Sequence, residues 1–250
     1  MFAPLQPIYP TAGIRAIEAL AAAGAEPTLM ERAGRAAAEE AVRLTSDRSG
    51  PVLIACGPGN NGGDGFVMAR RLIQAKRQAV VAYADDPERL PPDARIAYDA
   101  WLEAGGTISR SLPDPPPEGW SLIVDALFGI GLQRPVTGRY AQWIESLNAL
   151  PHPRMAIDLP SGLNADTGEV MGTVFKAAHT LTFIALKPGL LTLEGMDHAG
   201  ALIVRRIDID PENLLEPPGY LVSPALFRSN LKRRPYNSHK GSYGEVGIIG

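Results

Sequence analysis

Short runs of aliphatic and β-branched residues alternate with amphipathic segments along most of the chain, and this alternation restricts the fold more than any other feature. The predicted strands are residues 52–56, 79–83, 121–125, 154–158, 180–184 and 201–209. Apolar residues with helical spacing fill several of the intervals, at 67–75, 93–103 and 140–147. Strands that alternate with helices favour right-handed βαβ crossovers. The chain is therefore predicted to have an α/β fold, with a mostly parallel sheet and helices on both faces.

Two further helices are expected before the first strand. Thr11 is a candidate N-cap for a helix that buries Ile14, Ile17 and Leu20, and Pro27 is a candidate first residue of an alanine-rich helix. The proline-rich segment 113–117 predicts a rigid surface connection, and a second one, 211–235, predicts a linker. The domain itself is expected to occupy residues 1–210.

Composition excludes several classes of partner. A net charge of −3 and a pI near 5.8 give no long-range attraction to nucleic acid. The most apolar late stretch, 180–193, is interrupted by Lys187, Pro188 and Gly189, so no membrane span is predicted. A single cysteine, Cys56, forms no internal disulfide and is expected to be a buried packing residue, which favours a reducing, cytoplasmic setting.

A glycine-rich segment between the first of these strands and a helix is the strongest local signal. Five glycines fall within the nine residues 57–65, together with the polar side chains of Asn60, Asn61 and Asp64. Glycines let backbone amides approach an anion, and the start of the following helix adds partial positive charge. A purely structural turn needs fewer glycines, so a ligand-binding turn is the favoured interpretation.

The same segment also matches the G-x-G-x-x-G pattern of dinucleotide-binding proteins. Gly57, Gly59 and Gly62 supply the glycines, and Asp85 follows the next strand at the distance expected of a ribose-binding acid. A nicotinamide-dependent dehydrogenase is therefore one alternative. This dehydrogenase interpretation leaves the later sequence motifs without a role.

Those later motifs place one aspartate at the end of each of two more strands. Asp125 and Asp158 end the third and fourth strands, and each is followed by a glycine-containing loop. The carboxyl ends of parallel strands line the ligand crevice of an open sheet, so both are expected to converge with Asp64. Either aspartate alone is more simply explained as a turn or helix cap. Oxygen donors from Asn61, Asp125 and Ser161 would suit a hard cation.

Other polar residues are less informative. Lys187 follows the fifth strand, and its role stays open between a phosphate contact and a solvated surface lysine. His152, His179 and His198 have no partners at catalytic spacing and are expected to be structural.

Taken together, the motifs at 57–65, 125–135 and 158–168 resemble the YjeF N-terminal domain family, whose enzymatic members are NAD(P)HX epimerases. The segments 29–34 and 186–189 also look like that family. The resemblance covers roughly residues 12–210. It implies a Rossmann-like three-layer α/β/α sandwich that binds a damaged dinucleotide and one potassium ion. It also implies a homodimer.

The resemblance assigns roles residue by residue. It implies that Asn61, Asp125 and Ser161 hold potassium, and that Asp158 contacts the altered nicotinamide or its ribose. The implied substrate contacts are Asn60, Asn61, Gly62, Gly63, Asp64, Gly129, Ile130, Gly131, Leu132, Gln133, Arg134, Pro135 and Asp158.

The implied substrates, NADHX and NADPHX, carry a hydroxyl on the ring carbon next to nitrogen. Such a hemiaminal loses its stereocentre by ring opening or by loss of the hydroxyl as water, and both routes need proton transfer. Asp158 is the predicted general acid and base. The reaction leaves the oxidation level unchanged and needs no redox cofactor.

Residues 236–250 resemble the start of an ADP- or ATP-dependent NAD(P)HX dehydratase domain with a ribokinase-like fold. The expectation is therefore that the chain is the epimerase part of a bifunctional repair enzyme, with dehydratase activity only in the full-length protein. A remaining alternative is a non-catalytic interaction domain, the use that enhancer-of-decapping scaffold proteins make of this fold. Retention of Asp64, Asp125 and Asp158 favours the enzyme.

Overall fold

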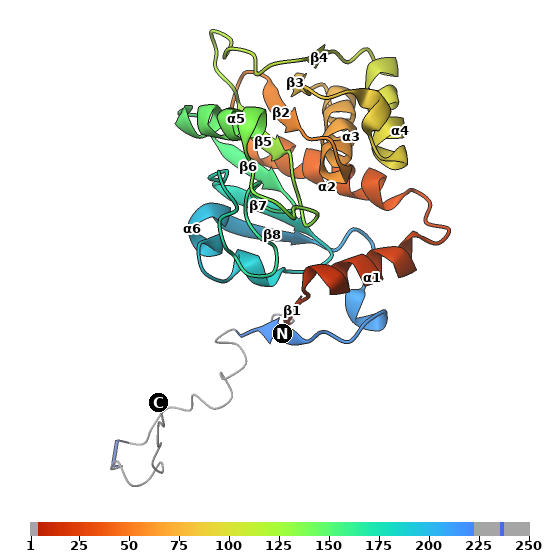
Figure 1. Cartoon of the computed structure of the whole chain (residues 1–250), viewed down its shortest axis with the longest axis vertical. Helices are drawn as coiled ribbons and strands as arrows, with labels where there is room; N and C mark the ends of the chain where they lie inside the picture. Colours follow the sequence, from red (N-terminus) through yellow and green to blue (C-terminus); the bar gives the residue numbers. More distant parts are fainter. Residues whose placement is uncertain (1–4, 223–235, 238–250) are drawn as a thin grey trace.

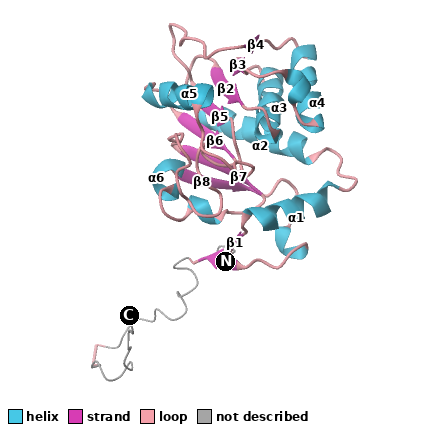
Figure 2. Cartoon of the chain, viewed as in Figure 1, coloured by secondary structure: helices cyan, strands magenta, loops and turns pink. Residues whose placement is uncertain are grey.

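The computed structural model describes residues 5–222 and 236–237, and its main feature is a seven-stranded sheet between two layers of helices (Figures 1 and 2). The strands of this sheet are β2 (Val52–Cys56), β3 (Ala79–Ala82), β4 (Ile108–Ser109), β5 (Leu122–Ala126), β6 (Arg154–Ile157), β7 (His179–Phe183) and β8 (Ala201–Arg205). Every neighbouring pair is parallel. The predicted α/β class and three-layer architecture are confirmed.

The strand order is β4-β3-β2-β5-β6-β7-β8. After β2 the chain builds outward to β3 and β4, and it then returns to the other side of β2 with β5. The direction of winding thus reverses between β2 and β5, and an open parallel sheet binds its ligands in the crevice at such a reversal. The topology alone therefore points to the loops that follow these two strands.

Alternating residues of the central strands enter different halves of the core. Val52, Ile54 and Cys56 belong to one apolar cluster, and Leu53 and Ala55 belong to another. The first cluster is covered by α2 (Leu29–Leu44), α3 (Asn60–Gln74) and α4 (Pro92–Glu103), and the second by α5 (Gly138–Ala149) (Figure 1). Because both faces are covered, β2 is apolar at every position rather than at alternate ones. The buried position predicted for Cys56 is confirmed.

The helices begin at points that the sequence pattern only partly predicts. α3 starts at Asn60, well before residue 67, so the glycine segment is itself the first turn of the helix. α1 (Thr11–Ala22) buries Ile14 and Ile17, but Leu20 is exposed. Thr11 is the first residue of α1 and not its N-cap, which is Pro10. α2 begins at Leu29 and not at Pro27, and its N-cap Thr28 accepts a hydrogen bond from the Glu31 amide.

Both ends of the described domain meet in a small separate sheet. β1 (Gln6–Ile8) pairs in antiparallel fashion with β9 (Gly219–Leu221), and the Tyr9 hydroxyl donates to the Leu215 carbonyl. The folded unit therefore extends past residue 210, and the linker predicted for 211–235 is wrong over its first part. Residues 223–235 and 238–250, which carry the rest of that prediction and most of the predicted second domain, lie outside the described residues.

The remaining short helices are α6 (Gly195–Ala199) and the 3-10 turns η1 (Pro87–Arg89), η2 (Pro188–Leu190) and η3 (Pro211–Asn213). Within the part of the chain that the structure describes, no helix is both long enough and apolar enough to cross a bilayer.

Candidate functional site

A cavity of about 400 Å³ lies at the carboxyl ends of the central strands, where the winding reverses. The loops after β2, β5 and β6 line it, together with one face of α1. The predicted substrate contacts that line it are Asn60, Asn61, Asp64, Gly129, Ile130, Gly131, Leu132 and Asp158. The other predicted contacts, Gly62, Gly63, Gln133, Arg134 and Pro135, do not line it, and the last three are exposed.

Asp158 is held in a fixed orientation at the centre of this cavity. It directly follows β6 with φ +67°, a left-handed conformation that aspartate tolerates better than most residues. Its Oδ2 accepts a hydrogen bond from the Ile130 amide at 3.0 Å, and its Oδ1 accepts one from the Lys187 ammonium at 2.7 Å. Both carboxylate oxygens are thus oriented by neighbouring loops, and this preorganises the group for chemistry.

Lys187 is a buried partner of Asp158. Its side chain is 1% exposed. Its ammonium donates three hydrogen bonds, to Asp158, to the Thr182 hydroxyl at 2.7 Å and to the Phe183 carbonyl at 3.0 Å. A solvated surface role is therefore excluded, and the open question about this residue is resolved in favour of the site.

Gly129 allows two polar side chains to approach its backbone. A Cβ added there would lie 2.5 Å from Oδ2 of Asp158 and 3.3 Å from Oδ1 of Asn61. Asn61 is buried, and neither of its side-chain polar atoms has a hydrogen-bond partner in the structure. A buried amide without partners is costly, so its oxygen is available to a ligand or an ion.

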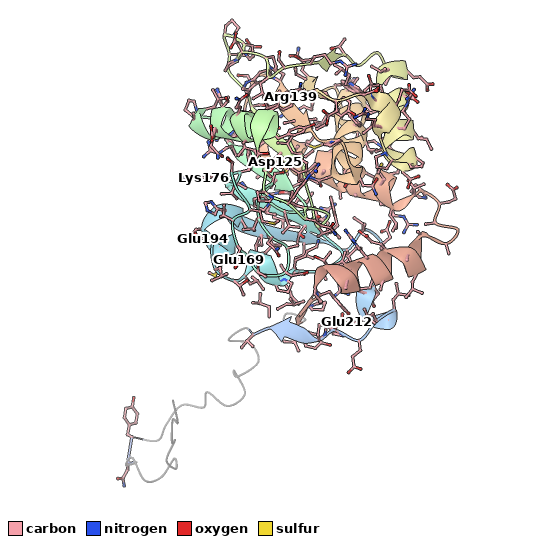
Figure 3. The ribbon with its side chains drawn as sticks, in the orientation of Figure 1. Asp125, Arg139, Glu169, Lys176, Glu194 and Glu212 are labelled. Atoms are coloured by element: carbon pink, nitrogen blue, oxygen red, sulfur yellow. The ribbon has the colours of Figure 1, made fainter. Side chains whose placement is uncertain are left out.

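Asp125 and Ser161 form a second, fully buried polar contact below the cavity. The Ser161 hydroxyl donates to Oδ1 of Asp125 at 2.7 Å, and the Ser161 amide donates to Oδ2 at 2.7 Å. The Phe128 amide in turn donates to the Ser161 hydroxyl, which ties this pair to the residue before Gly129. Asp125 lies inside the molecule, among the central strands (Figure 3). Burial raises its pKa to about 6, although the hydrogen bonds from Ser161 and Leu127 oppose the shift.

Two more carboxyls face Asp158 across the cavity. Burial raises the pKa of Asp64 well above its usual range, and the charges of Asp158 and Glu18 raise it further, while Lys187 opposes the shift. Burial likewise raises the pKa of Glu18, with an added contribution from Asp158. Asp64 and Asp158 are thus carboxyls in different surroundings, as expected of a pair that exchanges protons. Asp64 converges with Asp158 as predicted, whereas Asp125 lies deeper.

Asp85, the ribose-binding acid of the dehydrogenase alternative, is engaged elsewhere. It accepts a hydrogen bond from the Tyr140 hydroxyl at 2.6 Å and lies 3.6 Å from the Arg139 guanidinium. It does not line the cavity. The geometry therefore gives no support to a dehydrogenase that binds a ribose through Asp85.

Three charged residues of the cavity were not predicted as site residues from the sequence. Lys187 was noticed but left without a role, because its sequence context does not distinguish a buried lysine from a surface one. Arg15 and Glu18 were not noticed at all. Their spacing of three residues places them on the same face of α1, and this face turns toward the cavity.

Comparisons with known proteins agree with this geometry. The sequence model of the family described as YjeF-related protein N-terminus matches residues 26–189. Bifunctional NAD(P)H-hydrate repair enzymes from Leishmania major and Escherichia coli K12 are each 42% identical over 89% of this chain, and they are covered over 41% and 43% of their own length. An NAD(P)H-hydrate epimerase from Rhodopirellula baltica is 40% identical over 74% of this chain and 77% of its own.

The chain thus spans less than half the length of these bifunctional relatives but most of the shorter epimerase. A solved yeast structure described as ynu0, YNL200c, shares the fold with a TM-score of 0.65 and 22% identity, covering 82% of this chain and 94% of that one. The family match runs from the start of α2 through the glycine segment, both strand-end aspartates and Lys187. The chain belongs to the YjeF-related protein N-terminus family.

Proposed function

We propose that this chain interconverts the R and S epimers of hydrated NADH and NADPH at C6 of the nicotinamide ring, as part of nicotinamide cofactor repair. The observation that carries the proposal is the pair of Asp158 and buried Lys187 at the centre of the cavity. A relative that is 40% identical over 74% of this chain and 77% of its own length bears the name NAD(P)H-hydrate epimerase.

Epimerisation requires a proton donor and a proton acceptor near the hydroxyl-bearing carbon. Asp158 serves as acceptor and later donor, because its oxygens are fixed by Lys187 and the Ile130 amide. Asp64 holds a proton to higher pH than an ordinary carboxyl and supplies the complementary partner. Gly59, Gly129 and Gly131 line the cavity without side chains of their own, which leaves room for the ring and its ribose.

We expect the purified chain to convert the R epimer of hydrated NADH into a mixture of both epimers, faster than a protein-free control. Chromatographic separation of the epimers after quenched time points measures this directly. Asp158→Asn serves as the inactive control. Conversion no faster than in the protein-free sample contradicts the proposal, and binding of the hydrate without conversion identifies a non-catalytic interaction domain instead.

We further propose that Asn61, Asp125 and Ser161 contribute to a site for one potassium ion. The buried side-chain oxygen of Asn61 has no hydrogen-bond partner and can therefore coordinate a cation. The Asp125 carboxylate supplies the single negative charge of the site. Bound there, potassium would supply fixed positive charge beneath the loop that carries Gly129. Asn61, Asp125 and Ser161 would hold the ion. Their role in the protein is to keep the Gly129 loop in place.

We expect potassium chloride to raise the melting temperature of the chain above its value in tetramethylammonium chloride of equal ionic strength. An ion at 10–100 times its Kd adds about 1–3 kcal/mol. Asn61→Ala should remove this ion-specific rise without lowering the melting temperature in tetramethylammonium, since its amide has no hydrogen bond to lose.

Asn148→Ala is the matched control, because Asn148 bonds to the Val174 carbonyl and the Lys176 amide away from the site. This variant should melt earlier in both salts but keep the response to potassium. A wild-type chain that melts equally in the two salts contradicts the ion site.

The longer relatives are named bifunctional, and we propose that this chain is the epimerase part of such an enzyme. ADP or ATP then serves only a covalently linked dehydratase domain, which consumes the S epimer. The homodimer implied by the resemblance and the cytoplasmic location inferred from the single cysteine stay predictions.

A further inference from the structure

The helix α1 brings two charged side chains to the cavity from outside the stretch that the family model matches. That match begins at residue 26, whereas Arg15 and Glu18 lie on α1 and both line the cavity. Their contribution therefore adds to the site described above.

The position of α1 is fixed by loops that belong to the same site. Its first amide, that of Thr11, donates to Oδ1 of Asp166 at 2.6 Å, and Asp166 lies in the loop after β6. The Tyr9 amide donates to the Leu186 carbonyl at 2.9 Å, next to Lys187. Ile14 and Ile17 are buried beneath the helix, and the adjoining face, which carries Arg15 and Glu18, lines the cavity.

Arg15 stands where two cavities meet. Beside the cavity around Asp158, a second one of about 570 Å³ lies between α1 and α2, and Arg15, Glu18, Asn60, Asp64 and Phe183 line both. The Arg15 Nη2 atom is 3.9 Å from the Cβ position of Gly131, on the far side of the first cavity. A dinucleotide consists of two nucleoside halves joined by a pyrophosphate, so two adjoining cavities with a cation between them match its shape.

Arg15 is one of two cationic residues in the lining of these cavities. Their lining contains the carboxyls of Glu18, Asp64, Asp93 and Asp158, and its cationic residues are Arg15 and Lys187. An ammonium has three hydrogens to donate, and Lys187 uses all three on protein acceptors. In the described part of the chain, the Arg15 side chain has no hydrogen bond and no ion pair.

The first turn of α3 offers a second set of donors at the same place. Its N-cap, Gly59, has no side chain to satisfy the free amides of that turn, and Asn60 borders both cavities. Helix N-termini bind phosphate groups through such amides.

We propose that Arg15 binds the pyrophosphate of the hydrated dinucleotide at the junction of the two cavities, with the unreacting nucleoside half in the cavity between α1 and α2. The inference rests on the proposed function, since it assumes that substrate. Arg15 is a binding residue for the phosphates and takes no part in proton transfer at the ring.

The test compares two substrates that differ in the phosphates. One is hydrated NADH, and the other is hydrated reduced nicotinamide riboside, which has the same reacting ring and no phosphate. For Arg15→Gln we expect KM for hydrated NADH to rise about 10- to 100-fold, as for the loss of a charge-assisted hydrogen bond to phosphate. The kcat/KM of the riboside should change less than about twofold, since no phosphate is present to lose a contact.

Two further variants complete the design. Arg15→Lys keeps the charge but loses the planar fork, so its KM for hydrated NADH should fall between wild type and Arg15→Gln. Arg48→Gln is the matched control, because Arg48 is an exposed arginine before β2, at the opposite end of the strands from the cavity. Its kinetics should equal those of wild type on both substrates.

Three other outcomes would contradict either this inference or the proposed function. An Arg15→Gln variant with wild-type KM for hydrated NADH overturns the inference. Equal losses on both substrates overturn it as well, because they mean that Arg15 acts through the position of α1 rather than through phosphate. A wild-type chain that epimerises neither substrate overturns the proposed function itself, so the two failures are distinguishable.

Discussion

Asp158→Asn is expected to lower kcat/KM for epimerisation about 10²- to 10⁴-fold, the range for loss of a general acid or base. Asparagine has nearly the same shape and also tolerates the left-handed backbone at this position, so the cavity keeps its outline. The amide, however, cannot accept and return a proton. Chromatographic epimerisation assays on hydrated NADH measure the loss.

The same substitution is expected to destabilise the fold, because it leaves the buried Lys187 ammonium without a counter-charge. Loss of one partner of a buried ion pair costs about 3–5 kcal/mol, and the lower end applies here because the amide oxygen still accepts a hydrogen bond. Adding Lys187→Met removes the unpaired charge and fills the space of the lysine side chain with an apolar side chain. The double variant should regain most of the melting temperature and none of the activity.

This contrast separates chemistry from folding. Recovery of turnover together with stability would mean that Asp158 matters only as the partner of Lys187. Wild-type turnover in Asp158→Asn alone would remove it from the mechanism.

Gly57→Ala is expected to destabilise the domain by about 3 kcal/mol or more, the upper part of the range for overpacked sites. A Cβ at this position would lie 1.9 Å from the Leu127 carbonyl oxygen, which is backbone and has no rotamer to escape into. The Gly57 amide also donates to the Ala126 carbonyl, so relief of the clash would strain the contact between the ends of β2 and β5. Urea unfolding followed by circular dichroism gives the free energy.

Gly59→Ala is the matched control within the same glycine segment. A Cβ there meets nothing within 4 Å, and the backbone φ of −119° suits any residue. We expect a change of less than about 1 kcal/mol in the free energy of unfolding, as for an N-cap glycine replaced by alanine. Equal destabilisation by both substitutions would contradict the steric explanation of Gly57.

The sheet was predictable because its strands are apolar on both faces, and that signal does not depend on distant partners. The segments 52–56 and 79–83 coincide with β2 and β3 to within one residue. The start of α3 was not predictable in the same way. Asparagine and glycine are poor helix formers, and this turn is helical because it packs against the ends of β2 and β5. The sequence did not predict β1, β4 and β9, because strands of two or three residues are too short to show an alternation of apolar and polar residues.

The candidate site was predictable where it lies at strand ends and less so where it depends on tertiary contacts. Asp158 and the loop at 129–132 follow from the rule for parallel sheets, and they line the cavity as expected. Lys187 has the sequence context of a surface lysine, and only its three acceptors reveal that it is buried. Arg15 and Glu18 belong to a helix whose place is set by Asp166, more than 140 residues away in the chain.

The pairing of β1 with β9 has a consequence for how the domain opens. Two strands of three residues form a marginal sheet, so this seam is expected to separate at a much smaller free-energy cost than the central strands. Once it separates, α1 loses one attachment but keeps its hydrogen bond to Asp166 and the adjacent hydrogen bond of Tyr9, so the wall that it gives to both cavities is held by fewer contacts. Hydrogen exchange of the β1 and β9 backbone amides is therefore expected to be faster than that of the central strands, and it would report on an opening next to the helix that lines both cavities.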